Sequence, residues 1–94
     1  MPDEPRIKRA STLFALLADH QRLKIVLTLR AGNELFVGEV ARVLGVSASV
    51  ASHHLRKLRD LGILEDRGEG KLAYYSLRQR FVADLALAAL ARCA

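Results

Sequence analysis

SASVASHHLRKLRDLG, the stretch Ser47–Gly62, carries the strongest structural signal in this chain. At about 100° per residue it predicts a helix with two different faces. Ala51, Leu55 and Leu58 share one side, which predicts contact with a protein core. The other side carries hydroxyls, an imidazole and cations, and no carboxylate occurs before Asp60. Such a surface can lie against polyanionic DNA and reach base edges. Its residues are Ser49, Ser52, His53 and Arg56, with Lys57 at the border.

The residues before this helix predict a helix-turn-helix. The apolar pattern predicts a short helix over about residues 38–44, and Gly45 can adopt the positive φ that a tight turn needs. Ser47 is suited to cap the longer helix that follows, and Gly62 is suited to end it. Two helices joined by such a turn form a helix-turn-helix, and the second one is the recognition helix.

After the recognition helix the hydrophobic period changes from 3.6 to 2, which predicts a β-hairpin. We expect strands over residues 63–67 and 71–77, joined by a tip at residues 68–70. The chain is therefore expected to be mainly α with a small β-hairpin (α+β), a winged helix-turn-helix of about five helices and a two-stranded wing. The remaining expected segments are a flexible tail at 1–5, helices at 6–18, 20–31 and 79–92, and an extended link at 34–37.

Length and composition limit the class of protein. Ninety-four residues predict a single domain, residues 1–94, and a hydrophobic content of 51% excludes a disordered chain. The formal net charge of +5 favours nucleic acid or an anionic surface as a partner. A chain this short buries a modest core, so pairing of two copies would add stability.

The expected location is the cytoplasm. Cys93 is the one cysteine, so no disulfide can form within the chain, and a reducing compartment is the default. The start, Met1–Pro5, does not resemble a signal peptide, and no apolar run reaches the roughly 20 residues that span a bilayer. We find no nucleophile–base pair, phosphate loop or set of spaced metal ligands. We therefore expect neither an enzyme, nor a cofactor, nor a membrane partner.

Four segments carry a family resemblance. They are Glu34–Val40 (ELFVGEV), Leu44–Ser47 (LGVS), Ala51–Leu58 (ASHHLRKL) and Gly68–Leu77 (GEGKLAYYSL). In combination they resemble the ArsR/SmtB family of bacterial winged-helix repressors, closest to its CadC-like members that respond to cadmium and lead. The likeness covers the chain from about Ser11 onward.

The resemblance implies a homodimer that binds an imperfect palindrome in double-stranded DNA and leaves it when an inducer binds. The inducer stays unknown from the sequence. Ala48 stands where many relatives carry glutamine, which implies a different or looser operator preference. The resemblance also implies that the first and last helices form the dimer interface, here through Ile7, Phe14, Leu17, Phe81, Leu85, Ala88 and Ala89. The residues expected to contact DNA are Ser47, Ala48, Ser49, Ser52, His53, Arg56, Lys57 and, in the wing, Arg67 and Lys71.

The metal ligands of the related sensors are missing at the matching positions. Phe36 and Gly38 stand where CadC-like sensors carry two cysteines, and neither side chain offers a lone pair to a soft ion such as Cd²⁺ or Pb²⁺. Positions matching a second family site hold Gln79, Phe81 and Arg92. Arg92 keeps its proton and repels a cation. We therefore expect no metal at either site.

Two other interpretations stay open. The first keeps the fold and adds a metal trigger through a non-standard site drawn from His20, His53, Asp84 or Cys93. The second is a protein-interaction module without an operator of its own, whose recognition face would be apolar. Adjacent His53 and His54 do not by themselves predict an ion site, because neighbours on a helix point about 100° apart. We expect His53 to meet phosphate and His54 to be half-buried in the core.

Overall fold

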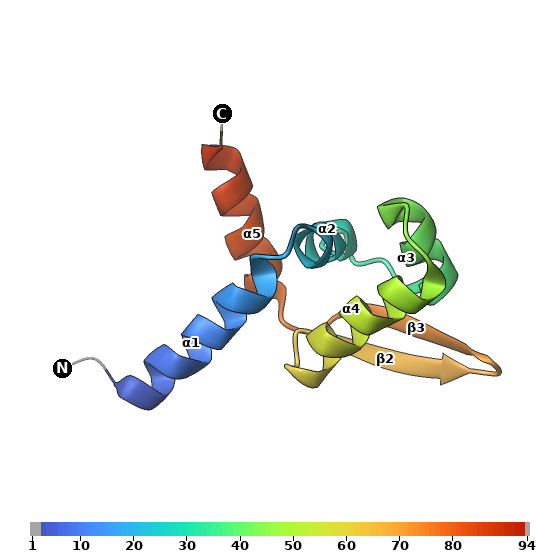
Figure 1. Cartoon of the computed structure of the whole chain (residues 1–94), viewed down its shortest axis with the longest axis horizontal. Helices are drawn as coiled ribbons and strands as arrows, with labels where there is room; N and C mark the ends of the chain where they lie inside the picture. The colour runs from blue at the N-terminus through green and yellow to red at the C-terminus, as the bar shows by residue number, and fades with distance from the viewer. Residues whose placement is uncertain (1–2, 94) are drawn as a thin grey trace.

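The computed structural model describes residues 3–93 (Figure 1). Within this range the chain forms five helices and a three-stranded antiparallel sheet. The elements, in chain order, are α1 (Glu4–Leu17), α2 (His20–Leu29), β1 (Leu35–Phe36), α3 (Val37–Leu44), α4 (Ala48–Asp60), β2 (Leu64–Glu69), β3 (Leu72–Leu77) and α5 (Arg80–Arg92).

The helix-turn-helix expected from the sequence is confirmed as α3, a tight turn and α4. Gly45 ends α3 with a φ of 69°, in the left-handed region that glycine adopts without strain. The Ser47 hydroxyl then accepts a hydrogen bond from the backbone N–H of Val50 at 3.2 Å. This bond satisfies one of the free N–H groups at the start of α4, so the turn fixes where the recognition helix begins.

The sheet has one more strand than expected. Leu35 and Phe36, expected as part of an extended link, form β1 and pair with Tyr75 and Tyr74 of β3. A segment of two residues is too short to show the alternation that predicts a strand. The hairpin tip is also shorter than expected, because Glu69 already pairs with Leu72 across the turn. The wing is therefore a β2–β3 hairpin with β1 added as a short third strand at the outer edge of β3.

Two helix boundaries also differ from expectation. Glu4 and Pro5, expected in the flexible tail, belong to the first turn of α1, where proline is favoured because its missing N–H needs no partner. At the other boundary, α2 ends at Leu29 instead of residue 31, and Gly32 follows with a φ of 87°. Residues 1–2 of the expected tail lie outside the described part of the chain.

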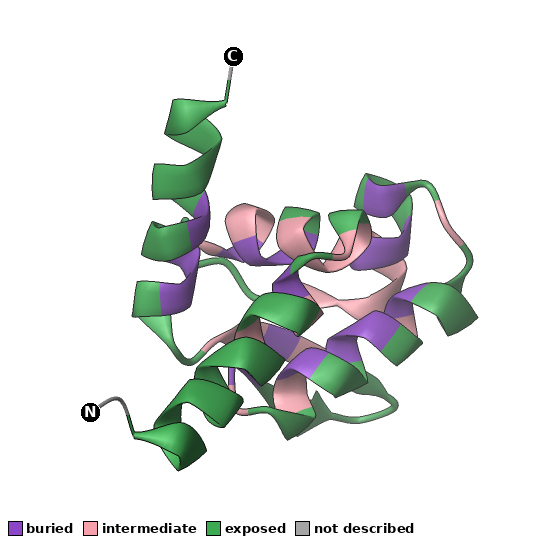
Figure 2. Cartoon of the chain, turned by 60° about the vertical axis from the view of Figure 1, so that its left-hand side comes forward, coloured by how far each residue is buried: buried purple, intermediate pink, exposed green. Residues whose placement is uncertain are grey.

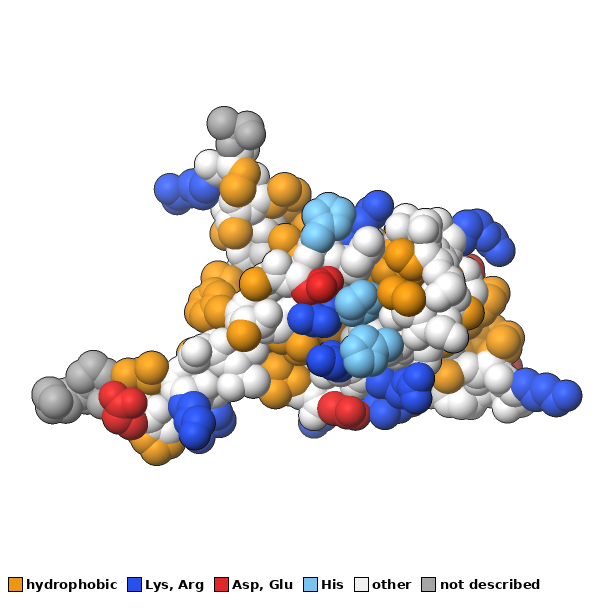
Figure 3. Space-filling model, viewed as in Figure 1, with side chains coloured by type: hydrophobic (Ala, Val, Ile, Leu, Met, Phe, Trp, Pro, Cys, Tyr) orange, Lys and Arg blue, Asp and Glu red, His pale blue; other side chains and the backbone are white. Residues whose placement is uncertain are grey.

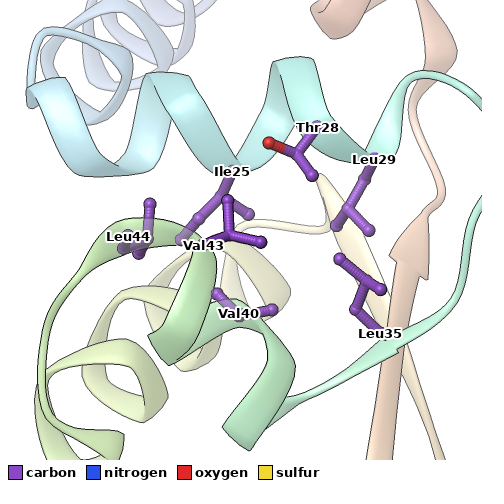
Figure 4. Close-up of a pocket in the computed structure, with 7 residues that line it drawn as sticks. All are labelled: Ile25, Thr28, Leu29, Leu35, Val40, Val43 and Leu44. Atoms are coloured by element: carbon purple, nitrogen blue, oxygen red, sulfur yellow. The ribbon is translucent and has the colours of Figure 1, made fainter.

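The core lies between α2, α3, α4, the sheet and the first half of α5, which buries Val82, Ala83 and Ala86 (Figure 2). A small cavity of about 10 Å³ remains between α2, α3 and β1 (Figure 4). It is apolar and has about the volume of one water molecule at most, so it offers no ligand site. The largest fully buried side chains are Val26, Leu29, Leu55, Leu58, Ile63, Leu64 and Val82.

Most of α1 and the C-terminal half of α5 extend away from this core in different directions (Figure 1). Arg30, the residue that follows α2, forms an ion pair at 3.1 Å with Asp84 of α5. Leu17, which the sequence predicts at a dimer interface, is largely buried within the chain, where α1 turns into α2, and it lines a groove between α1, α2 and α5. No helix within residues 3–93 is long and apolar enough to cross a membrane.

Candidate nucleic-acid interface

The outer face of α4 is polar and cationic. Ser49, His53 and Arg56 are exposed there, and Ser52 is half-buried at its edge. The Nε of Arg56 donates to the carbonyl oxygen of Ser52 at 3.4 Å, which leaves the outer end of the guanidinium in solvent. Lys57 is exposed at the border of this face, as the helical spacing predicts. The face therefore presents donors and positive charge on a rigid helix.

The start of α4 adds to this positive character. Ser47 and Ala48 are exposed, and the first turn of the helix contains no acidic residue. The N-terminus of a helix carries a partial positive charge and free N–H groups, which favour a phosphate. At the other end, Arg59 pairs with Asp60 and with Asp66 of β2, both at 3.2 Å, and so ties α4 to the wing.

The inner face of α4 anchors the helix. Ala51, Leu55 and Leu58 are fully buried, which confirms the two-faced pattern of the sequence. His54 lies on the same side and is buried, more deeply than the half-buried position expected for it. Figure 3 shows histidine side chains beside Lys, Arg and a carboxylate over the centre of the molecule. A polar contact therefore accompanies the apolar packing of α4.

That contact is made by Arg22 of α2, which sequence reasoning did not single out. Its Nη1 lies 3.4 Å from Nδ1 of His54, and its Nε donates to the carbonyl oxygen of Leu16 at 2.7 Å. Because arginine only donates, Nδ1 is the acceptor and the neutral ring carries its proton on Nε2. Asp19 caps α2 by accepting from the N–H groups of Gln21 and Arg22 at 2.9 and 3.1 Å. Arg22 thus links the C-terminal end of α1 and the N-terminal end of α2 to the recognition helix α4.

This contact predicts a pH dependence of stability. Burial lowers the pKa of the His54 imidazole below its usual 6.5; the cations Arg22, His53 and Lys57 act in the same direction, and Asp19 opposes them. The unfolded chain takes up this proton near pH 6.5, whereas the folded chain takes it up only at lower pH. The free energy of unfolding should therefore decrease as the pH falls below about 6.5 and level off below the lowered pKa of the folded state.

Urea unfolding followed by circular dichroism from pH 8 to pH 5 checks this prediction. His54→Asn keeps an acceptor near Nδ1 but does not titrate, so its unfolding free energy should vary less over this range. Hydrogen bonds from the backbone N–H groups of α2 lower the pKa of Asp19. Its contribution to the free energy of unfolding is therefore lost only below about pH 4, outside the range in which His54 titrates in the unfolded chain. An equally steep profile in His54→Asn would contradict the assignment.

The two cations expected in the wing have different surroundings. Lys71 is exposed at the hairpin turn. Arg67 donates from Nε and Nη2 to the two carboxylate oxygens of Glu34, at 3.2 and 3.1 Å, and from Nη1 to Glu69 at 2.6 Å. Its guanidinium also lies over the ring of Tyr74, 5.0 Å from the ring centre. These carboxylates raise the pKa of Arg67. The guanidinium therefore stays charged, but its charge is neutralised by carboxylates of the same chain.

The positions that the family resemblance matches to metal sites carry no thiolate, imidazole or carboxylate: they are Phe36, Gly38, Gln79, Phe81 and Arg92. The ring of Phe36 covers Gly38 so closely that a Cβ at position 38 would lie 2.8 Å from the ring atom Cε2. A cysteine at position 38 would therefore need Phe36 to move. At the second set of positions, Phe81 is exposed on α5 and Arg92 ends that helix. These side chains supply no ligand set.

The residues of the open non-standard alternative are also not gathered into one site. Asp84 is paired with Arg30, and the thiol of Cys93 donates to the carbonyl oxygen of Ala89 at 3.3 Å. Among the residues that the structure describes, no three His, Cys, Asp or Glu side chains come close enough to hold an ion.

The sequence profile described as "Bacterial regulatory protein, arsR family" matches residues 19–66, which contain α2, α3 and α4. The chain belongs to the ArsR family. Over 73 residues it is 47% identical to a cadmium resistance transcriptional regulatory protein, a CadC homolog of Staphylococcus aureus, covering 78% of this chain and 60% of the relative. The first three curated relatives are matched over 60% to 63% of their own length.

Two solved structures share the fold over almost the whole chain. HlyU from Vibrio cholerae has a TM-score of 0.84 at 32% identity, with 98% of this chain and 100% of that chain covered. The homodimeric winged helix-turn-helix DNA-binding domain of a possible ArsR-family regulator from Mycobacterium bovis has a TM-score of 0.79 at 28% identity. The alignment covers 97% of this chain and 85% of that one.

These comparisons confirm three expectations from the sequence. The ArsR/SmtB resemblance is correct, since both the family profile and CadC-like relatives match. The winged helix-turn-helix fold is correct, since neighbours of that fold superpose over nearly all of the chain. The expected class of protein is correct at the level of the family, since the family profile and the fold that match are those of transcriptional regulators and not of enzymes.

Proposed function

We propose that this ArsR-family chain is a single-domain, homodimeric repressor that binds a specific sequence of double-stranded DNA in the cytoplasm. The observation that carries the proposal is the outer face of α4, where Ser49, His53 and Arg56 stand exposed on a helix whose other face is fully buried. A helix held this rigidly can enter a major groove with its N-terminal residues at base edges. Lys57 and Lys71 then supply phosphate contacts.

A second copy of the chain is the proposed partner for α1 and α5. Phe14 and Phe81 are 56% and 59% exposed, which is unusual for phenylalanine in a chain of this size. Figure 3 shows apolar side chains in the angle between the two helices. An apolar groove also runs between α1, α2 and α5 there. The proposed interface residues are Ile7, Phe14, Leu17, Phe81, Leu85, Ala88 and Ala89.

This pairing determines the proposed operator. A two-fold axis between the copies places two α4 helices in successive major grooves, about 34–36 Å apart, so the site is an imperfect palindrome with half-sites about one helical turn apart. Lys and Arg contacts to phosphate supply much of the affinity, so binding weakens steeply with salt. We further propose that the inducer is not a metal held at the two positions used by related sensors, because Phe36 closes over Gly38.

Selection of bound duplexes from a random DNA library by the purified full chain tests the proposal. We expect enrichment of a palindrome with half-sites about 10 base pairs apart, bound by two chains. The selection is repeated with zinc and with cadmium, and we expect the same sequences at the same affinity. Release of DNA by either ion would restore the metal-responsive alternative. A library that shows no enrichment at low salt would favour the protein-interaction alternative instead.

A further inference from the structure

The guanidinium of Arg67 is held by groups from two separate parts of the chain. Glu34 comes from the link between α2 and β1, 33 positions away, and accepts two hydrogen bonds in a fork geometry. Glu69 lies on the same strand and accepts a third. The guanidinium carbon lies over the ring of Tyr74 on the neighbouring strand, 5.0 Å from the ring centre. The ion-paired side chains are 42% to 66% exposed, so a phosphate or other anion from solution can replace a carboxylate in these bonds.

The charge of this cluster opposes DNA. Two carboxylates surround one guanidinium, so the cluster of Glu34, Arg67 and Glu69 has a net charge of −1 at neutral pH. Arginine has five N–H donors, and three are already used by carboxylates. A DNA phosphate near the wing therefore meets a negative cluster, unless it replaces at least one carboxylate on Arg67.

We infer that Glu34 and Glu69 compete with DNA phosphate for Arg67. The guanidinium then becomes available to phosphate only when the recognition helix α4 is bound at its specific DNA site. This inference rests on the proposed function. The competing carboxylates lower the affinity for DNA that contacts the wing while α4 is not bound in the major groove. On a correct site, α4 brings a phosphate close enough to displace a carboxylate. Glu34 and Glu69 therefore set the balance between unspecific and specific binding without touching a base.

Salt dependence distinguishes a new phosphate contact from simple removal of negative charge. Each phosphate neutralised steepens the slope of log affinity against log salt concentration by about 0.9. In the double variant Glu34→Gln, Glu69→Gln, which is nearly isosteric, Arg67 is released. We expect affinity for random duplex DNA to rise by about 3- to 10-fold at low salt, with a slope steeper by about 0.9. Addition of Arg67→Ala should remove the change in slope.

Glu65→Gln is the matched control. Glu65 is an exposed carboxylate on the same strand and makes no hydrogen bond with Arg67. Its removal should raise affinity slightly and leave the salt slope unchanged. An unchanged slope in the double variant, or an equal change with Glu65→Gln, would overturn the inference. Arg56→Ala is measured alongside: if it weakens operator binding while the double variant behaves as wild type, only the inference fails. If the wild-type chain binds no DNA, both fail.

Discussion

Leu85→Glu is expected to leave the chain monomeric and to lower its affinity for a palindromic operator by about 100- to 10,000-fold. Leu85 lies on the side of α5 that faces the angle with α1, beside the groove that a second copy would fill. A buried glutamate in that interface would be charged and unpaired, which strongly opposes association. A monomer holds one half-site only and loses the gain in effective concentration that a linked second helix provides.

Leu87→Glu is a closely matched control for this change. Leu85 and Leu87 are both 37% exposed on the same helix, so each substitution replaces an equally exposed leucine with glutamate. Two residues apart on a helix, they point roughly 160° away from each other. Leu87→Glu should stay dimeric in sedimentation and should bind DNA as the wild type does in fluorescence anisotropy. Dimers of Leu85→Glu, or equal behaviour of the two variants, would rule out the proposed interface.

Arg56→Ala is expected to weaken operator binding by about 10- to 100-fold, the range for loss of a bidentate hydrogen bond to a guanine. Its one intramolecular bond is a long one to Ser52, and the side chain is exposed. The free energy of unfolding should therefore change by less than about 0.5 kcal/mol. The measurement is the operator affinity at fixed salt, beside a thermal unfolding curve.

Two further variants separate base reading from charge. Arg56→Lys keeps the charge but not the planar fork, so it should retain phosphate attraction and lose preference among bases. Arg92→Ala removes an equal charge at the end of α5, which points away from α4 in Figure 1, and should have little effect. If Arg56→Ala lowers affinity equally for all sequences and flattens the salt slope by about one phosphate, Arg56 contacts the backbone instead of a base. If its operator affinity is unchanged, the recognition face is misplaced.

Most of the helix-turn-helix could be predicted from the sequence because its causes are local. The spacing of Ala51, Leu55 and Leu58 identifies the buried side of α4, since helical geometry turns sequence spacing into direction. Gly45 and Ser47 mark the turn because each acts through its own backbone or through a neighbour three residues away. The resemblance to the ArsR/SmtB family rested partly on these residues, which the family profile includes, and partly on the wing segment Gly68–Leu77, which lies beyond the matched range of 19–66.

The sequence thus determined which residues α4 buries, which it exposes and in what order the elements follow. Tertiary structure alone decided the contacts between distant segments: Arg22 with His54, 32 positions apart, and Arg67 with Glu34, 33 positions apart. It also made β1 a strand and buried Leu17. The physical reason is that these outcomes depend on which surfaces meet after the chain folds back, and neither helical nor strand periodicity contains that information.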